Sequence, residues 1–222
     1  MSPSSPDTAD AAYFKFVPWC NDLISRQGSI LFTPTSRLPD DPTIGATRDQ
    51  LFRKTLHHDG ALPYCIGLYQ DPTTSPDLQP TTPGSGPQSP TLYIKSSSIL
   101  FDLRPGLNGF NGSAHGGLLS SLIDEAMGSL IFINHLVQTT HEKQGRKLPA
   151  GTLDLNSTRV FTASMAVRFQ KPVPTPSIVV VTASLVKIEG RKIFFDVTVK
   201  GQHGEEYARC DGLWLSLPLE KV

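Results

Sequence analysis

The clearest pattern of apolar and polar positions lies in the middle of the chain, at residues 115–137. Its apolar residues recur at helical spacings and cover much of the circumference of a helix; they are Leu118, Leu119, Leu122, Ile123, Ala126, Met127, Leu130 and Ile131. This pattern predicts one long helix that is buried on most of its sides. The stretch before it, residues 106–114, is rich in glycine and asparagine and predicts an irregular loop.

Downstream of this helix the pattern changes to that of strands. β-Branched and aromatic residues predict three or four of them, at 159–170, 177–189, 192–201 and 205–217. Residues 201–204 predict a hairpin turn, and 138–157 a long polar connection. Upstream, residues 91–104 predict a strand with a polar interruption at Ser96–Ser98. One helix followed by antiparallel strands is typical of the α+β class, with the helix packed on one face of the sheet.

The N-terminal part is less regular, and we divide the chain into an extension, 1–90, and a main domain, 91–222. The extension predicts, in order, a helical piece at 11–27 interrupted at Pro18, a turn-rich connector at 34–46, a short amphipathic helix at 47–58 and a strand at 61–69. Residues 72–90 contain six prolines among 19 residues, which predicts a mobile loop.

Composition narrows the possible partners. Twenty basic and 20 acidic residues give a net charge of zero, so nothing favours nucleic acid or an anionic membrane surface. The three cysteines, at 20, 65 and 210, are too widely spaced for a metal or disulfide motif, and we expect a reduced, cytoplasmic protein. We see no signal peptide and no apolar run that approaches a membrane span, and we expect no membrane partner.

Two carboxylates, Asp124 and Glu125, interrupt the apolar helix. A carboxylate in a helix that is otherwise buried is costly unless it is paired or used, so this stretch is the candidate functional region. We assign the chemistry to Asp124 and interpret Glu125 as a structural or interface charge.

The start of the same helix is the second candidate element. A glycine-rich loop that opens a helix leaves backbone N–H groups without partners and concentrates partial positive charge there. Gly116 and Gly117 let a ligand approach that backbone closely. Such an end suits an anion, or a carbonyl oxygen that becomes anionic during a reaction.

These two elements do not meet within one chain. Asp124 follows His115 by nine residues, which is about 13 Å and roughly 2.5 turns of helix, so the two side chains point to opposite faces. A site that uses both therefore needs two copies of the chain. We predict a homodimer or a dimer of dimers.

Four motifs then carry a family resemblance. The first is His115-Gly-Gly, with Asp124 nine residues after the histidine and Gly112 three residues before it. The others are the segment from Thr162 to Pro174, which ends in Pro-Val-Pro, Gly-Arg-Lys at 190–192, and Gly-Leu-Trp-Leu-Ser at 212–216. Together, over about residues 92–218, they resemble the hot-dog-fold acyl-thioesterases of the phenylacetate-pathway and thioesterase-superfamily-member type. The resemblance implies an antiparallel sheet wrapped around one long central helix, preceded here by an N-terminal helical extension.

The resemblance also implies an activity. The substrate would be an acyl-CoA or acyl-carrier-protein thioester, and Asp124 would act on its carbonyl as general base or nucleophile. Thr162 aligns with a hydroxyl that holds the attacking water, although it is also an ordinary strand threonine. His115 either positions the carbonyl or holds the loop. No cofactor and no metal are implied.

The same resemblance suggests substrate-binding residues. Many relatives carry Asn six residues before the histidine; here that position is Gly109, and Asn111, beside Gly112, is the candidate to replace it. Arg191 and Lys192 are candidates for the phosphates of CoA or of a carrier arm, or are exposed cations of a turn.

Two other functions stay open at this point. One is a hot-dog enzyme of a biosynthetic pathway, such as secondary metabolism, that releases, cyclises or dehydrates a polyketide-like chain, with dehydration ranked lower. The other is a non-catalytic acyl-binding or assembly subunit, which stays open because position 109 lacks the asparagine of many relatives.

Overall fold

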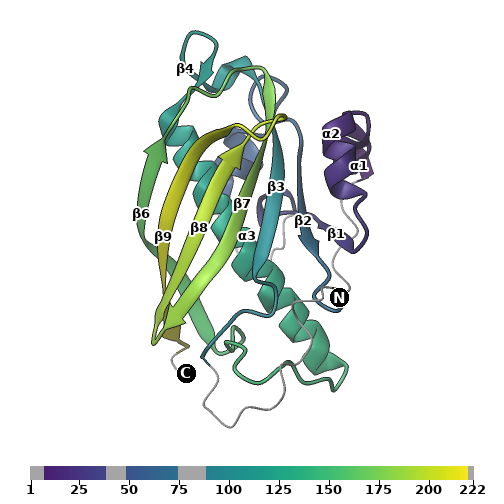
Figure 1. Ribbon diagram of the computed structural model, residues 1–222, viewed down its shortest axis with the longest axis vertical. Coiled ribbons are helices and arrows are strands. Elements are labelled where there is room, and N and C mark those ends of the chain that lie inside the picture. Colours follow the sequence, from purple (N-terminus) through teal and green to yellow (C-terminus); the bar gives the residue numbers. More distant parts are fainter. Residues whose placement is uncertain (1–7, 39–48, 75–88, 220–222) are drawn as a thin grey trace.

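The computed structural model describes residues 8–38, 49–74 and 89–219, and its centre is the 28-residue helix α3, Gly116–Lys143 (Figure 1). The helix predicted at 115–137 is confirmed, but it continues six residues into the expected polar connection. Polar side chains are tolerated there because they are bonded. The Gln138 Oε1 accepts a hydrogen bond from the Leu155 N–H at 2.9 Å, and the Thr140 hydroxyl donates to the Leu136 carbonyl at 2.8 Å.

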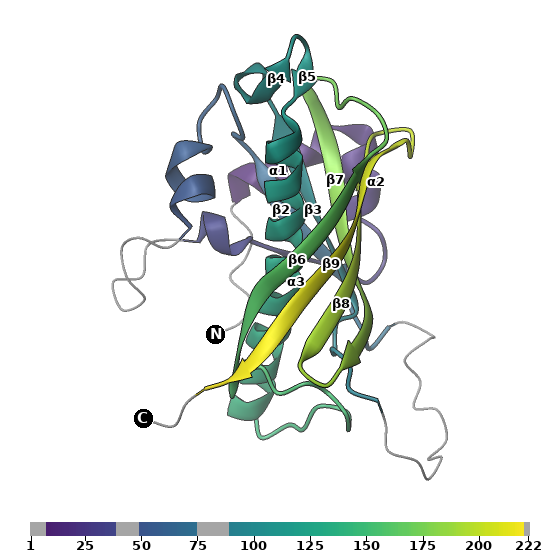
Figure 2. The same ribbon diagram turned by 90° about the vertical axis from the view of Figure 1, so that its left-hand side faces the viewer.

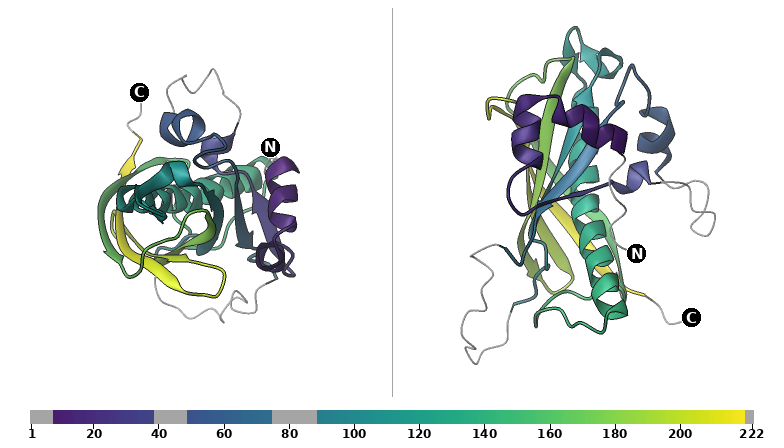
Figure 3. Two further views of the ribbon diagram at one scale, coloured as in Figure 1. Left: turned by 90° about the horizontal axis from the view of Figure 1, so that it is seen from above. Right: turned by 90° about the vertical axis from the view of Figure 1, so that its right-hand side faces the viewer.

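One antiparallel sheet of seven strands curves around α3, in the order β1-β2-β3-β7-β8-β9-β6. Figure 3 (left) shows the strands curling around the helix when the molecule is viewed from above. The strands are β1 (Ser29–Phe32), β2 (Cys65–Gln70), β3 (Ser96–Leu103), β6 (Thr158–Phe169), β7 (Ser177–Glu189), β8 (Lys192–Lys200) and β9 (Glu206–Pro218). This is the α+β hot-dog arrangement that the sequence predicted.

The four C-terminal strands are confirmed to within one residue at each end, whereas the predicted strand at 91–104 begins too early. β3 starts at Ser96, so the serines are the beginning of the strand and not an interruption of it. They fit because their hydroxyls pair across to β7: Ser96 with Ser184 at 2.9 Å and Ser98 with Thr182 at 2.8 Å.

The N-terminal segment contributes both helices and strands. Helices α1 (Thr8–Lys15) and α2 (Pro18–Ile24) are separated at Pro18, as predicted, and β1 was not predicted. The two helices cover the outer face of β2 and β3 (Figure 3, right), where Phe14 and Cys20 pack against a second apolar cluster that includes Leu100. Because β1 pairs with β2, and β2 pairs with β3, the segment 1–90 and the rest of the chain share one sheet.

Two short helical segments lie beside α3, on the side away from β6 (Figure 2). They are the 3₁₀ turn η1 (Thr35–Arg37) and the single π-helical turn η2 (Leu51–Thr55). The helix predicted at 47–58 is thus reduced to one turn within its described part. Residues 39–48 lie outside the described residues, and so do 75–88, which make up most of the proline-rich segment.

The main core fills the space between α3 and the inner face of the sheet. Six residues of α3 are fully buried there: Leu122, Ile123, Ala126, Met127, Leu130 and Ile133. A Cβ on Gly212 of β9 would overlap the Met127 sulfur, so glycine lets the Met127 side chain lie directly against this strand. By length and composition α3 is apolar enough to cross a membrane, so the prediction that no apolar run approaches a membrane span is wrong. The buried core helix of a globular protein meets the same criterion of length and composition.

The start of α3 is held by a compact loop. It consists of the 3₁₀ turn η4 (Pro105–Leu107) and a two-stranded ribbon of β4 (Asn108–Phe110) and β5 (Ser113–Ala114). Gly112, with φ +68°, makes the turn of the ribbon. The His115 N–H donates to the Leu107 carbonyl at 2.9 Å, which fixes where the helix begins.

Candidate active site

His115 is the N-cap residue of α3. Its Nδ1 accepts a hydrogen bond from the Gly117 N–H at 2.9 Å, so the imidazole satisfies one of the donors that the helix start leaves open. Of the two N–H groups predicted to face a carbonyl oxygen, that of Gly117 is therefore occupied in this conformation. The Gly116 N–H is the donor that stays available.

The local packing also explains the glycine at position 109. A Cβ there would lie 2.7 Å from the His115 Cδ2 and 2.8 Å from the His115 Cα, closer than real contacts allow. An asparagine at this position would displace the N-cap histidine. Asn111, the candidate to replace it, is exposed together with Gly112 at the tip of the β4–β5 ribbon.

Asp124 follows His115 by about two and a half turns of α3 and faces the edge strand β6. The Thr162 Oγ1 donates a hydrogen bond to the Asp124 Oδ1 at 2.7 Å. The two residues are 38 positions apart in sequence, and the structure brings them into direct contact. The second oxygen of Asp124 has no hydrogen-bond partner among the described residues.

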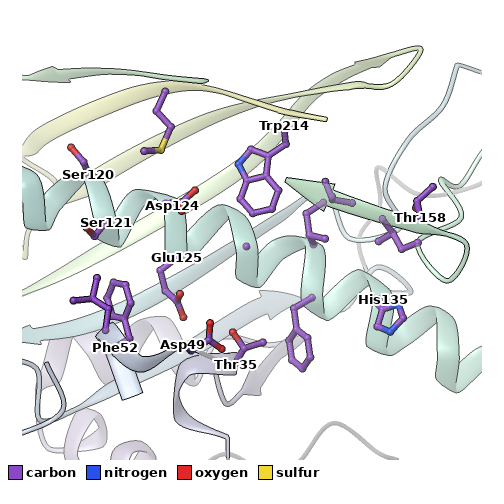
Figure 4. Close-up of a pocket in the computed structure, with 17 residues that line it drawn as sticks. Thr35, Asp49, Phe52, Ser120, Ser121, Asp124, Glu125, His135, Thr158 and Trp214 are labelled. Atoms are coloured by element: carbon purple, nitrogen blue, oxygen red, sulfur yellow. The ribbon is translucent and has the colours of Figure 1, made fainter. Parts of the chain in front are cut away.

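Asp124 lines a cavity of about 680 Å³ that lies along α3 (Figure 4). From the helix the lining includes Ser120, Ser121, Glu125, Gly128, Ile131, Phe132 and His135; from other elements it includes Thr35, Asp49, Leu51, Phe52, Leu155, Thr158, Val160, Met165 and Trp214. One end of the lining near Asp124 is rich in polar groups, and the rest is mostly apolar. Such a mixture suits a ligand with a polar head and an apolar body.

Sequence reasoning missed several of these residues. Ser120 and Ser121 precede Asp124 by four and three positions, so helical spacing alone places them on its face. Trp214 entered the sequence analysis only as part of the motif at 212–216, with no role in a site, yet it lines the cavity. Its buried indole Nε1 has no partner among the described residues and can donate to a ligand.

Glu125 lines the same cavity from the opposite side. The Ser36 hydroxyl donates to the Glu125 Oε1 at 2.6 Å. Burial is the largest cause that raises the pKa of this carboxyl, and Asp49 and Asp124 raise it further, while the bond from Ser36 and the charge of Arg37 lower it. No sequence signal distinguished this residue from an ordinary helix charge, because its partner lies 89 positions away.

The remaining predicted residues lie elsewhere. Gly116 lines a separate cavity of about 340 Å³ at the helix start, together with Phe169 at the end of β6. Arg191 and Lys192 are exposed at the β7–β8 turn and line neither cavity. Within one chain the structure therefore brings Asp124 and Thr162 together, and leaves His115 and Gly116 apart from them. Among the described residues no group of three or more His, Cys, Asp or Glu is arranged to hold a metal ion.

Residues 111–208 match the family profile of the Thioesterase superfamily. This part of the chain belongs to that superfamily. The chain is similar to verlamelin biosynthesis protein B from a Lecanicillium species, which is 28% identical over 75% of this chain and 71% of its own length. The bovine acyl-coenzyme A thioesterase THEM4 is 30% identical over 57% of this chain and 44% of its own length.

The human acyl-coenzyme A thioesterase THEM5 is 30% identical over 57% of this chain and 43% of its own length. The chain thus spans less than half of these two thioesterases. Solved thioesterase-superfamily structures are similar in part. A hypothetical thioesterase from Streptococcus pneumoniae, solved with coenzyme A, has a TM-score of 0.44 at 12% identity, over 57% of this chain and 82% of its own. The E. coli PaaI protein has a TM-score of 0.42 at 14% identity, over 55% and 72%.

Proposed function

We propose that this protein hydrolyses the thioester of an acyl-CoA, with Asp124 as the general base that activates water. The observation that carries the proposal is the 2.7 Å hydrogen bond from Thr162 to Asp124 at the wall of a cavity. One carboxylate oxygen is held by the hydroxyl, and the other is left to accept a proton from water. The Thr162 oxygen keeps lone pairs with which to hold the same water.

The chemistry follows from these groups. The water oxygen bonds to the thioester carbonyl carbon while its proton passes to Asp124. The carbonyl oxygen becomes an oxyanion, which a backbone N–H and the positive end of a helix stabilise. When the carbon–sulfur bond breaks, the proton goes from Asp124 to the sulfur, and the products are a carboxylic acid and free CoA. The acyl group occupies the apolar part of the 680 Å³ cavity.

The oxyanion donor comes from a second copy of the chain. Gly116 and Asp124 are eight residues apart on one helix, about 12 Å, which is beyond the reach of a single carbonyl. Strand β6 is one of the two edges of the sheet and carries the half-exposed Phe161 and Phe169, with exposed fractions of 52% and 54%. A two-fold dimer along this edge uses the same patch twice, so that it can place Asp124 of each chain near the other chain's helix start.

Subunit exchange tests the proposed sharing. His115→Ala protein, if inactive, is mixed with inactive Asp124→Asn protein, and mass measurement confirms exchange. Each heterodimer then has one doubly damaged site and one intact site, so up to about a quarter of the wild-type activity returns after random re-pairing. If exchange occurs and no activity returns, the catalytic groups lie within one chain.

A second candidate differs in the carrier of the acyl group. A relative that matches 75% of this chain is a biosynthesis protein, which favours release of a pathway intermediate from a carrier protein. Hydrolysis of the same acyl group from CoA and from a phosphopantetheinylated carrier protein distinguishes the two. A kcat/KM at least tenfold higher for the carrier substrate supports the second candidate.

A further inference from the structure

Asp124 and Glu125 are adjacent in sequence but serve opposite sides of the cavity. Successive residues of an α-helix project about 100° apart. Asp124 is bonded to Thr162 on β6, and Glu125 to Ser36 on η1. Figure 4 shows Glu125 directed toward Asp49, while Asp124 lies on the other side of the helix. The second carboxyl group is therefore part of the site, in a role of its own.

Glu125 meets a segment that we call the strap, defined as residues 33–38 and 49–56 with the turns η1 and η2. Four of its residues line the cavity: Thr35, Asp49, Leu51 and Phe52. Arg37 joins the two parts of the strap, because its Nη1 donates to the Phe52 carbonyl at 3.3 Å. It also holds the strap to the start of β2, where its Nε donates to the Cys65 sulfur at 3.2 Å. The Ser36–Glu125 bond joins the strap directly to α3.

Loss of the Ser36–Glu125 hydrogen bond would leave a buried polar group without a partner. Ser36 is only 1% exposed, so its hydroxyl cannot turn to solvent if the carboxyl is removed. A buried hydroxyl without a partner is costly, and the strap must shift to satisfy it. The carboxyl in turn bears the cost of burial, which a helix residue with only a packing role would avoid. The strap also precedes residues 111–208, the part that the superfamily profile describes.

We propose that Glu125 is a positioning residue: through Ser36 it holds the strap against α3 and so fixes the width of the cavity on the side opposite to Asp124. Insofar as the cavity holds an acyl group, this rests on the proposed function. Large acyl groups, which extend to the Thr35 and Phe52 wall, depend on this contact more than small ones do. Glu125 thus contributes to the selection of acyl size.

The test compares three variants with two controls. Glu125→Ala and Ser36→Ala each break the contact, from opposite sides, so that one remains informative if the other folds poorly. Glu125→Gln keeps an oxygen that accepts from Ser36. Glu142→Ala removes an exposed glutamate from the same helix, and Ser25→Ala removes an exposed hydroxyl that bonds to a side chain.

Two measurements are made on each protein. Hydrogen–deuterium exchange follows the backbone amides of residues 49–56, and steady-state kinetics follow acyl-CoAs of increasing acyl size. We expect amide exchange in the strap to be about fivefold faster in the two alanine variants, the effect of one lost hydrogen bond, and unchanged in Glu125→Gln and both controls. In the alanine variants, KM relative to the wild type should increase as the acyl group becomes larger. This increase in KM should be greater than the accompanying decrease in kcat.

The proposal is wrong if amide exchange in residues 49–56 is as slow in both alanine variants as in the wild type. It is also wrong if amide exchange in Glu125→Gln is as fast as in Glu125→Ala. The exchange measurement does not depend on hydrolysis. A protein that hydrolyses no acyl-CoA but shows the expected exchange pattern therefore refutes the proposed function while the role of Glu125 in holding the strap stands.

Discussion

The contact between Thr162 and Asp124 allows a quantitative test of the proposed mechanism. Thr162→Ala removes the hydroxyl that holds one carboxylate oxygen at 2.7 Å. A hydrogen bond to a charged group contributes about 1.5–3 kcal/mol, and because Thr162 is exposed we take the lower end of that range. About 1.4 kcal/mol is a factor of ten in rate, so kcat should fall roughly tenfold.

Asp124→Asn removes the base itself, which lowers kcat by roughly 10²–10⁴. The two residues form one unit in the proposed mechanism, so the double variant should be no slower than Asp124→Asn alone. The assay is acyl-CoA hydrolysis followed by a thiol reagent. Thr198→Ala, on the outer face of β8 and away from the cavity, is the matched control and should behave as the wild type.

The double variant shows whether Thr162 acts through Asp124. If the losses of the two single variants multiply in the double variant, Thr162 does not act through Asp124. Unchanged turnover in Asp124→Asn would remove that carboxylate from the mechanism altogether. Circular dichroism and size measurement on each variant exclude loss of the fold as the cause of a low rate.

Two further predictions concern the cavity wall. A Cβ on Gly128 would lie 3.5 Å from the Trp214 Cη2, so Gly128→Ala should fit without a change in activity. The added methyls of Gly128→Val should narrow the cavity and lower kcat/KM at least tenfold for long acyl chains relative to short ones. Hydrolysis of a series of acyl-CoAs of increasing chain length measures this ratio. Burial raises the pKa of Glu125 in the folded protein above its ordinary value of 4.5. Between the unfolded-state pKa and the raised folded-state pKa, the folded protein binds more protons than the unfolded one. The contribution of this residue to the free energy of unfolding therefore falls as pH rises. The Tm of Glu125→Gln minus that of the wild type should therefore increase from pH 4.5 upward in thermal unfolding scans, and a difference that is constant with pH would contradict the assignment.

The sequence by itself determined the elements whose periodicity is strong. The buried helix from 116 and the four C-terminal strands follow from local patterns of apolar residues, because each pattern matches one regular backbone geometry. It also supplied the pair Asp124 and Thr162, although through family resemblance and not through geometry. Where the pattern was ambiguous, as at Ser96–Ser98, prediction was wrong, because cross-strand bonding decides whether a polar residue fits a strand.

Only the tertiary structure decided how these elements build a site. Glu125 was interpreted as a structural or interface charge, and it lines the cavity because the strap residue Ser36, 89 positions earlier, packs against its helix. The His115 imidazole caps its own helix, so the Gly117 N–H is occupied, which no spacing argument reveals. Contacts between residues far apart in sequence have no local periodicity, and they arise only when the sheet closes around α3.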